Sequence, residues 1–123
     1  MRQDFFENGV VLVFSDETVE AWDDLVSPGL KIGYGGDRKI VRLVLVDPKR
    51  RAGTDQVLIV DRYDSVADAL DVELDEGSWH DTEETGEGFL IDFDEEHRIV
   101  ALEFLGASKL FPQAALARPH HAA

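Results

Sequence analysis

Cysteine is absent from this 123-residue sequence, and no long apolar run is present. The absence of cysteine excludes disulfides, thiolate catalysis and cysteine-ligated metals, and it suits a reducing compartment. The longest uninterrupted apolar stretches, such as Val10 to Phe14, are far too short to cross a bilayer as a helix. The first residues, MRQDFFENG, contain no apolar core of signal-peptide length. We therefore expect a soluble, cytoplasmic protein without a membrane partner.

Basic residues are scarce in the second half of the chain. Residues 62–123 hold 15 acidic and 4 basic residues, a net charge of −11, whereas residues 1–61 hold 11 and 8, a net charge of −3. All 15 acids lie between Asp64 and Glu103, where Arg98 is the only base. Such a surface repels nucleic-acid phosphates and attracts basic partners, although it also serves solubility alone. We expect no direct nucleic-acid binding and, if the charge is functional, a basic protein partner.

The stretch from Gly88 to Lys109 predicts an antiparallel hairpin that turns at residues 94–97. Apolar and acidic residues alternate before the turn, and bulky and β-branched residues follow it. One face is expected to collect six apolar residues, namely Phe89, Ile91, Phe93, Val100, Leu102 and Phe104. The expected cross-strand pairs are Phe93 with Arg98, Ile91 with Val100, and Phe89 with Leu102. Further strands are expected at residues 10–14, 18–26, 30–34, 40–46, 57–60, 70–74 and 79–84.

A shift of 59 residues lays an earlier segment on this hairpin. The identical pairs are Gly29 with Gly88, Ile32 with Ile91, Ile40 with Ile99, Val41 with Val100, and Leu43 with Leu102. Strand, turn and strand coincide in one register, which favours a tandem duplication with copies at about 9–49 and 57–111. The alternative is that any two β-hairpins align this well.

These patterns predict a mainly β protein, α+β at the margin, built from antiparallel hairpins and meanders. We expect two tandem pseudo-twofold copies that share one core, because a single hairpin-based sheet has an apolar face to cover. A helical turn is expected near 65–69, capped by Asp64, and a second near 112–117. Residues 1–111 are expected to form one domain and residues 112–123 a short tail. The chain is expected to be a monomer or a homodimer.

The second half also carries a series of short motifs in a fixed order. They are YDSVADAL (63–70), TEE (82–84), IDFD (91–94), RIVALEFL (98–105) and AS (107–108). In this order they resemble a family of small bacterial proteins catalogued as Domain of Unknown Function 2283, over roughly residues 57–111. Members of that family usually place glycine in the hairpin turn, where this chain has Glu96 and His97. The resemblance singles out Tyr63, Asp64, Asp68 and Arg98 as family-pattern residues, and it implies a fold but no activity.

A metal site is one chemical hypothesis for the acidic half. Strand alternation predicts that Asp92 and Asp94 share a face, with Glu103 on the partner strand and His97 nearby. Clustered carboxylate oxygens suit Ca²⁺, Mg²⁺ or Mn²⁺, but the spacing matches no known metal motif. Exposed carboxylates on an acidic protein explain the pattern equally well.

Catalytic patterns are weak throughout the sequence. Ser78, His80 and Asp81 lie close together, yet no nucleophile motif surrounds them. Residues 33–36 are glycine-rich but match no phosphate-binding fingerprint, so we interpret them as a hairpin turn. Trp22 and Trp79 are interpreted as partly buried packing residues. No catalytic or cofactor-binding residue is assigned.

Three functions remain open at this point. The first is a non-catalytic binding or regulatory module whose acidic half meets a basic partner. The second is a small metal-binding protein or metal-dependent enzyme that uses the Asp92, Asp94 and Glu103 edge. The third is an accessory fold without a ligand. Carboxylates spread over an exposed surface favour the first function, and convergence into a concave pocket favours the second.

Overall fold

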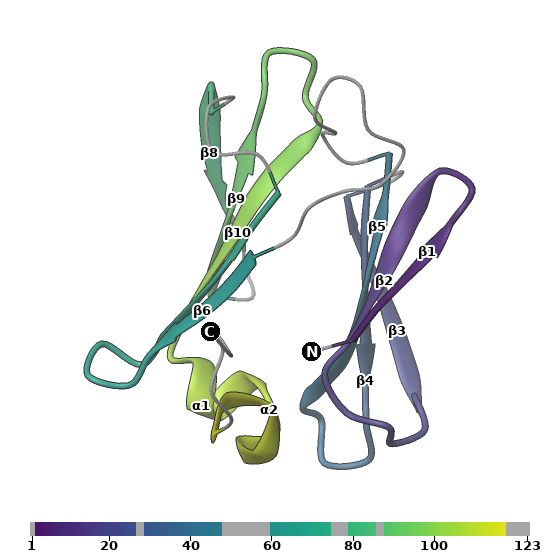
Figure 1. Cartoon of the computed structure of the whole chain (residues 1–123), viewed down its shortest axis with the longest axis vertical. Helices are drawn as coiled ribbons and strands as arrows, with labels where there is room; N and C mark the ends of the chain where they lie inside the picture. The colour runs from purple at the N-terminus through teal and green to yellow at the C-terminus, as the bar shows by residue number, and fades with distance from the viewer. Residues whose placement is uncertain (1, 27–28, 48–59, 75–78, 86–87, 118–123) are drawn as a thin grey trace. The chain divides into compact units, whose positions relative to one another are not determined.

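A computed structural model describes residues 2–26, 29–47, 60–74, 79–85 and 88–117 of the chain (Figure 1). These residues form a mainly β structure, as predicted. The strands are β1 (Arg2–Phe6), β2 (Gly9–Val13), β3 (Ala21–Val26), β4 (Leu30–Tyr34), β5 (Ile40–Val46), β6 (Val60–Asp64), β7 (Ala69–Glu73), β8 (Asp81–Glu84), β9 (Phe89–Phe93) and β10 (Ile99–Leu105). Two short helices follow, α1 (Ala107–Leu110) and α2 (Gln113–Ala117).

The strands form two five-stranded antiparallel sheets with the same topology. The order is β1-β2-β5-β4-β3 in the first sheet and β6-β7-β10-β9-β8 in the second. We call the first sheet the N-terminal copy and the second the C-terminal copy. The identical order supports the prediction of an internal repeat.

The register of the central strands repeats as well. Val10 faces Leu45 and Leu12 faces Leu43 in the N-terminal copy, and Leu70 faces Phe104 and Val72 faces Leu102 in the C-terminal copy. Each copy also has a bulge at the same place, the second residue of its long strand, which is Val41 in one copy and Val100 in the other. Local geometry thus repeats even where side chains differ.

The predicted register of the β9–β10 hairpin was wrong by up to two residues. Ile91 faces Leu102 instead of Val100, and Phe89 faces Phe104 instead of Leu102. The bulge at Val100 and the wider turn, closed by a hydrogen bond of 2.9 Å from the Asp94 amide to the Arg98 carbonyl, cause this shift. A two-residue shift leaves each side chain on its original face. All six apolar residues expected on that face are therefore still buried.

The N-terminal copy has an equivalent buried face. Its fully buried residues are Val10, Leu12, Leu30, Ile32, Val41, Leu43 and Leu45. These side chains alternate with half-buried or exposed ones along β4 and β5. That the two copies share one core stays a prediction.

Two local predictions need correction. No strand was expected before residue 10, but β1 pairs with β2, and Phe6 lies opposite Gly9. A Cβ atom at Gly9 would lie 2.5 Å from Cζ of Phe6, so the missing side chain makes room for the ring. Residues 65–68 form a turn between β6 and β7, and no helix is assigned there. The helical turn expected near 112–117 is confirmed by α2.

The chain divides into two compact units. One contains Met1–Asp47 together with Ser108–Pro119, and the other contains Pro48–Ala107. The C-terminal helices therefore group with the N-terminal copy from Ser108 onwards. No helix in the described part of the chain is long and apolar enough to span a membrane. Residues 57–59 of the strand expected at 57–60, and Ser78, lie outside the described residues.

Candidate functional site

The exposed face of the C-terminal copy gathers four carboxylates, which we call the acidic face: Asp71, Glu73, Asp92 and Glu103. Asp71 and Glu73 alternate along β7 with the buried Leu70 and Val72, so they point away from the buried face. Pairing of β10 with both β7 and β9 brings these side chains together across three adjacent strands.

The register explains how close these carboxylates lie. Glu103 on β10 lies directly opposite Asp71 on β7. Ala101, two residues earlier on β10, lies between Glu73 on one side and Asp92 on the other. The small alanine side chain leaves a depression of about 150 Å³ lined by the four carboxylates together with Ala101 and Leu102.

Two members of the acidic face have perturbed acidity. Burial raises the pKa of Glu103, and the charges of Asp71 and Asp92 raise it further. Burial also raises the pKa of Asp71; Arg62 opposes this, while Asp92 and Asp64 add to it. The ionised acidic face is therefore under mutual repulsion, which a cation placed between the carboxylates would relieve.

An exposed tryptophan is fixed beside this face. The Trp79 indole Nε1 donates a hydrogen bond of 2.7 Å to Thr82 Oγ1, which donates one of 2.6 Å to Asp92 Oδ1. Trp79 is 63% exposed and Trp22 is 52% exposed, so both rings are only partly buried, as expected. The Trp79 ring is thus linked through Thr82 to Asp92, one of the four carboxylates.

Asp94, a predicted metal ligand, uses its side-chain oxygens for hydrogen bonds within its own turn. The side chain is 6% exposed, and Oδ1 accepts hydrogen bonds from the amides of Glu96 (2.9 Å) and Arg98 (2.8 Å). Oδ2 accepts one of 3.2 Å from Arg98 Nε. Burial acts to raise the pKa of Asp94, but these amide hydrogen bonds and the Arg98 charge outweigh it and lower that pKa.

His97, the other predicted ligand near the turn, packs as an aromatic ring. It stacks on Phe93 with ring centroids 4.0 Å apart and planes 10° from parallel, and its Nε2 lies 3.8 Å from Glu83 Oε2. Its φ of 61° lies in the left-handed region, where glycine is the favoured residue. The stacking contact on Phe93 explains what a histidine adds at this strained position.

The structure therefore brings together Asp92 and Glu103 but not the other two predicted ligands. Among the described residues, no group of three or more histidines or carboxylates is arranged to hold a metal ion. Metal binding at this edge stays a prediction. If a metal ion binds here, the melting temperature of the protein should rise in millimolar Ca²⁺, Mg²⁺ or Mn²⁺. This rise should be lost in Asp92→Asn.

Sequence reasoning missed Asp71 and Glu73 as members of the site. Their alternation with apolar residues was recognised, but the pairing of β7 with β10 was not. The signal available was the repeat itself, since the same long-range pairing occurs between β2 and β5.

The family-pattern residues build turns. The Tyr63 hydroxyl donates a hydrogen bond of 2.6 Å to Asp68 Oδ1, and this bond, followed by burial, raises the pKa of Tyr63. Asp64 Oδ1 accepts the amides of Val66 (2.9 Å) and Ala67 (3.2 Å), so the residue predicted to cap a helix closes a turn instead. Asp68 has a φ of 53°. Their contacts are structural.

Two of the three weak catalytic candidates, His80 and Asp81, lie in the described part of the chain. His80 and Asp81 are both exposed. The His80 amide bonds to the Phe93 carbonyl at 2.8 Å, and Asp81 pairs with Phe93 in the β8–β9 ladder. Ser78 lies outside the described residues.

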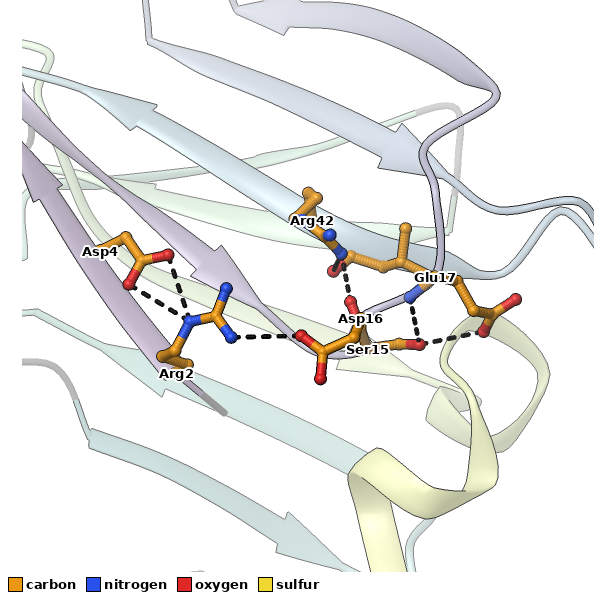
Figure 2. Close-up of polar contacts among 7 residues, drawn as sticks. Arg2, Asp4, Ser15, Asp16, Glu17 and Arg42 are labelled. Atoms are coloured by element: carbon orange, nitrogen blue, oxygen red, sulfur yellow. Dashed lines mark hydrogen bonds and ion pairs between the residues drawn. The ribbon is translucent and has the colours of Figure 1, made fainter.

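The N-terminal copy presents different chemistry at the equivalent positions. The register places Val11 and Val44 where the other copy has Asp71 and Glu103, and Arg42 where it has Ala101. Figure 2 shows that Arg42 is held by backbone carbonyls, bonding to those of Ser15 and, at 3.1 Å, Val41. The four-carboxylate arrangement is thus specific to the C-terminal copy within the described chain.

Other charges of the N-terminal copy are paired locally. Arg2 contacts Asp4 at 3.2 Å and Asp16 at 3.1 Å, and the Ser15 hydroxyl donates to Glu17 at 3.0 Å (Figure 2). These exposed pairs are screened by solvent and contribute little stability.

Comparison with known families gives a match over part of the chain. Residues 62–108 match the family described as Protein of unknown function (DUF2283). The DUF2283 match covers most of β6 and all of β7 to β10, which is nearly the whole C-terminal copy. The matching strand order suggests that the N-terminal copy is a second, diverged copy. No curated protein and no solved structure matches the chain.

Proposed function

We propose that this protein, whose C-terminal copy matches DUF2283, is a non-catalytic binding module whose acidic face meets a basic segment of a partner protein. The observation that carries the proposal is the gathering of Asp71, Glu73, Asp92 and Glu103 around one depression. Burial and mutual repulsion raise the pKa of Asp71 and of Glu103. A cation that binds between these carboxylates is attracted by their negative potential and relieves their repulsion.

The surroundings of the acidic face favour an arginine or lysine side chain. The exposed Trp79 ring, tied to Asp92 through Thr82, offers an aromatic surface on which a cation can stack. The two described basic residues of the C-terminal copy, Arg62 and Arg98, leave most of its carboxylates uncompensated, and Arg98 is engaged by Asp94 and Glu96. Long-range attraction from this charge accelerates association with a basic partner.

A labelled arginine-rich peptide tests this proposal by fluorescence anisotropy at low and at physiological salt. The test variant is Asp71→Asn/Glu103→Gln, and the matched control is Asp16→Asn/Glu17→Gln on the N-terminal copy. Each pair changes the net charge of −14 by the same two units, to −12. We expect the test variant to weaken binding by about tenfold and the control by less than about twofold.

The comparison separates a specific face from the total charge of the molecule. Equal weakening in both double variants would show that net charge alone attracts the peptide, and the proposal would be wrong. Absence of peptide binding by the native protein at low salt would contradict it as well, because exposed charges are screened least there.

A further inference from the structure

The segment Ser108–Ala117, which we call the strap, packs into the compact unit of the N-terminal copy although it follows β10 in the chain. Phe111 is fully buried and Leu116 is 7% exposed. The Phe111 ring contacts that of Phe14, with centroids 4.7 Å apart and planes at 53°. The strap is thus anchored by an aromatic contact at the end of β2.

A second anchor lies at the β4–β5 turn. Lys39 Nζ donates hydrogen bonds of 3.2 Å to the carbonyls of Ser108 and Lys109. Both carbonyls belong to α1, whose last turn leaves such acceptors without helical partners. An ammonium group is a favourable donor at this position because it carries charge as well as N–H groups.

The repeat shows that this use of Lys39 is special to the N-terminal copy. Its counterpart, 59 residues later, is Arg98, which is bound at 3.2 Å by Asp94 within the same turn. The counterpart of Asp94 is Gly35, which has no carboxylate to offer. The two turns share their backbone bonds, with Gly35 bonded to Lys39 as Asp94 is to Arg98. The cation of the first turn is therefore directed to the strap.

We propose that the strap completes the fold of the N-terminal copy. The N-terminal copy is thus stabilised by residues that are synthesised after the C-terminal copy. The Lys39 bonds span 69 and 70 residues of chain. The DUF2283 match ends at Ser108, where the strap begins. Release of the strap uncovers Phe14 and Phe111 and loosens the N-terminal copy, while the C-terminal copy keeps its own turn contacts.

Hydrogen exchange of the full-length protein, followed by mass spectrometry of peptides, tests this proposal. Phe111→Ala should speed the exchange of β2 and β5 by about tenfold or more, because a fully buried ring is lost. Lys39→Met should speed it by about threefold, as expected for lost hydrogen bonds from a charged donor. In both variants the exchange of β7 and β10 should increase less than that of β2 and β5, because only the N-terminal copy loses its contacts with the strap.

Arg98→Met is the matched control, because it removes the equivalent cation from the other copy. It should speed exchange in β9 and β10 more than in β2 and β5. If Phe111→Ala does not fold, the milder Lys39→Met still decides the matter. Equal acceleration of both copies in Lys39→Met, or no acceleration of the N-terminal copy, would overturn the proposal.

Discussion

At the scale of single residues, the acids of the C-terminal copy divide into two kinds with opposite effects on stability. Asp94 is buried, yet its pKa is lowered because amide hydrogen bonds and Arg98 favour the ionised form. Glu103 is surrounded by other carboxylates, and burial and repulsion raise its pKa. The sequence shows both simply as acids beside apolar residues. Only the partners, which depend on the turn and on strand pairing, separate them.

This difference predicts opposite responses to pH. The folded-state pKa of Asp94 lies below the ordinary value of about 3.9, so its stabilisation is present above that pH and is lost as pH falls further. Glu103 has a raised pKa, so its ionisation lowers stability as pH rises through that value. We expect Asp94→Asn to destabilise at pH 7 by about 1.5–3 kcal/mol.

The paired variant Glu103→Gln should instead raise the melting temperature at pH 7 by about 2 °C. That gain should disappear once the pH falls below the ordinary glutamate pKa of about 4.3. Thermal unfolding by circular dichroism between pH 7 and pH 3 measures both effects. A lower melting temperature for Glu103→Gln at pH 7 would contradict the description of the acidic face.

At the scale of elements, the hairpins could be predicted and their exact pairing could not. Residues 30–34 and 40–46 were expected as strands, and β4 and β5 have these bounds. The bulge at Val100 escaped detection because an apolar residue there fits the alternation of either register. Strand β1 was missed because its sequence, RQDFF, shows no clean alternation, and its pairing depends on Phe6 lying over Gly9.

Neighbouring side chains of β10 lie on opposite faces of the sheet, one buried and one exposed. Phe104 is fully buried and contacts Phe89, with ring centroids 4.6 Å apart. Phe104→Ala should destabilise the protein by about 3–5 kcal/mol. Leu105, the next residue, points to the other face and is 52% exposed, so Leu105→Ala should change stability by less than about 0.5 kcal/mol. Equal urea unfolding midpoints for the two variants would contradict the placement of Phe104 on the buried face and Leu105 on the exposed face.

At the scale of the whole molecule, the duplication could be predicted from the sequence and the strap could not. The duplication is visible because strand, turn and strand repeat at a spacing of 59 residues, and the two strand orders agree with it. The strap could not be predicted because the apolar residues around Phe111 and Leu116 follow no period long enough to indicate what they pack against. One of its contacts comes from Lys39, far away in the sequence.

We propose that the two copies complete one another within one chain. Each copy is one antiparallel sheet with a single apolar face, and such a face must be covered by a second layer. We propose that the faces of the two copies form one shared core. In a chain with a single copy, a second chain would have to take that role, and twofold dimers are the commonest arrangement.

Light scattering coupled to size-exclusion chromatography, with circular dichroism of the same samples, tests this claim most directly. The full chain should elute as a folded species that needs no second chain for its stability. The fragment of residues 55–123, which contains the C-terminal copy and the strap but no partner sheet, should self-associate or unfold. A well-folded monomer of residues 55–123 would contradict the claim.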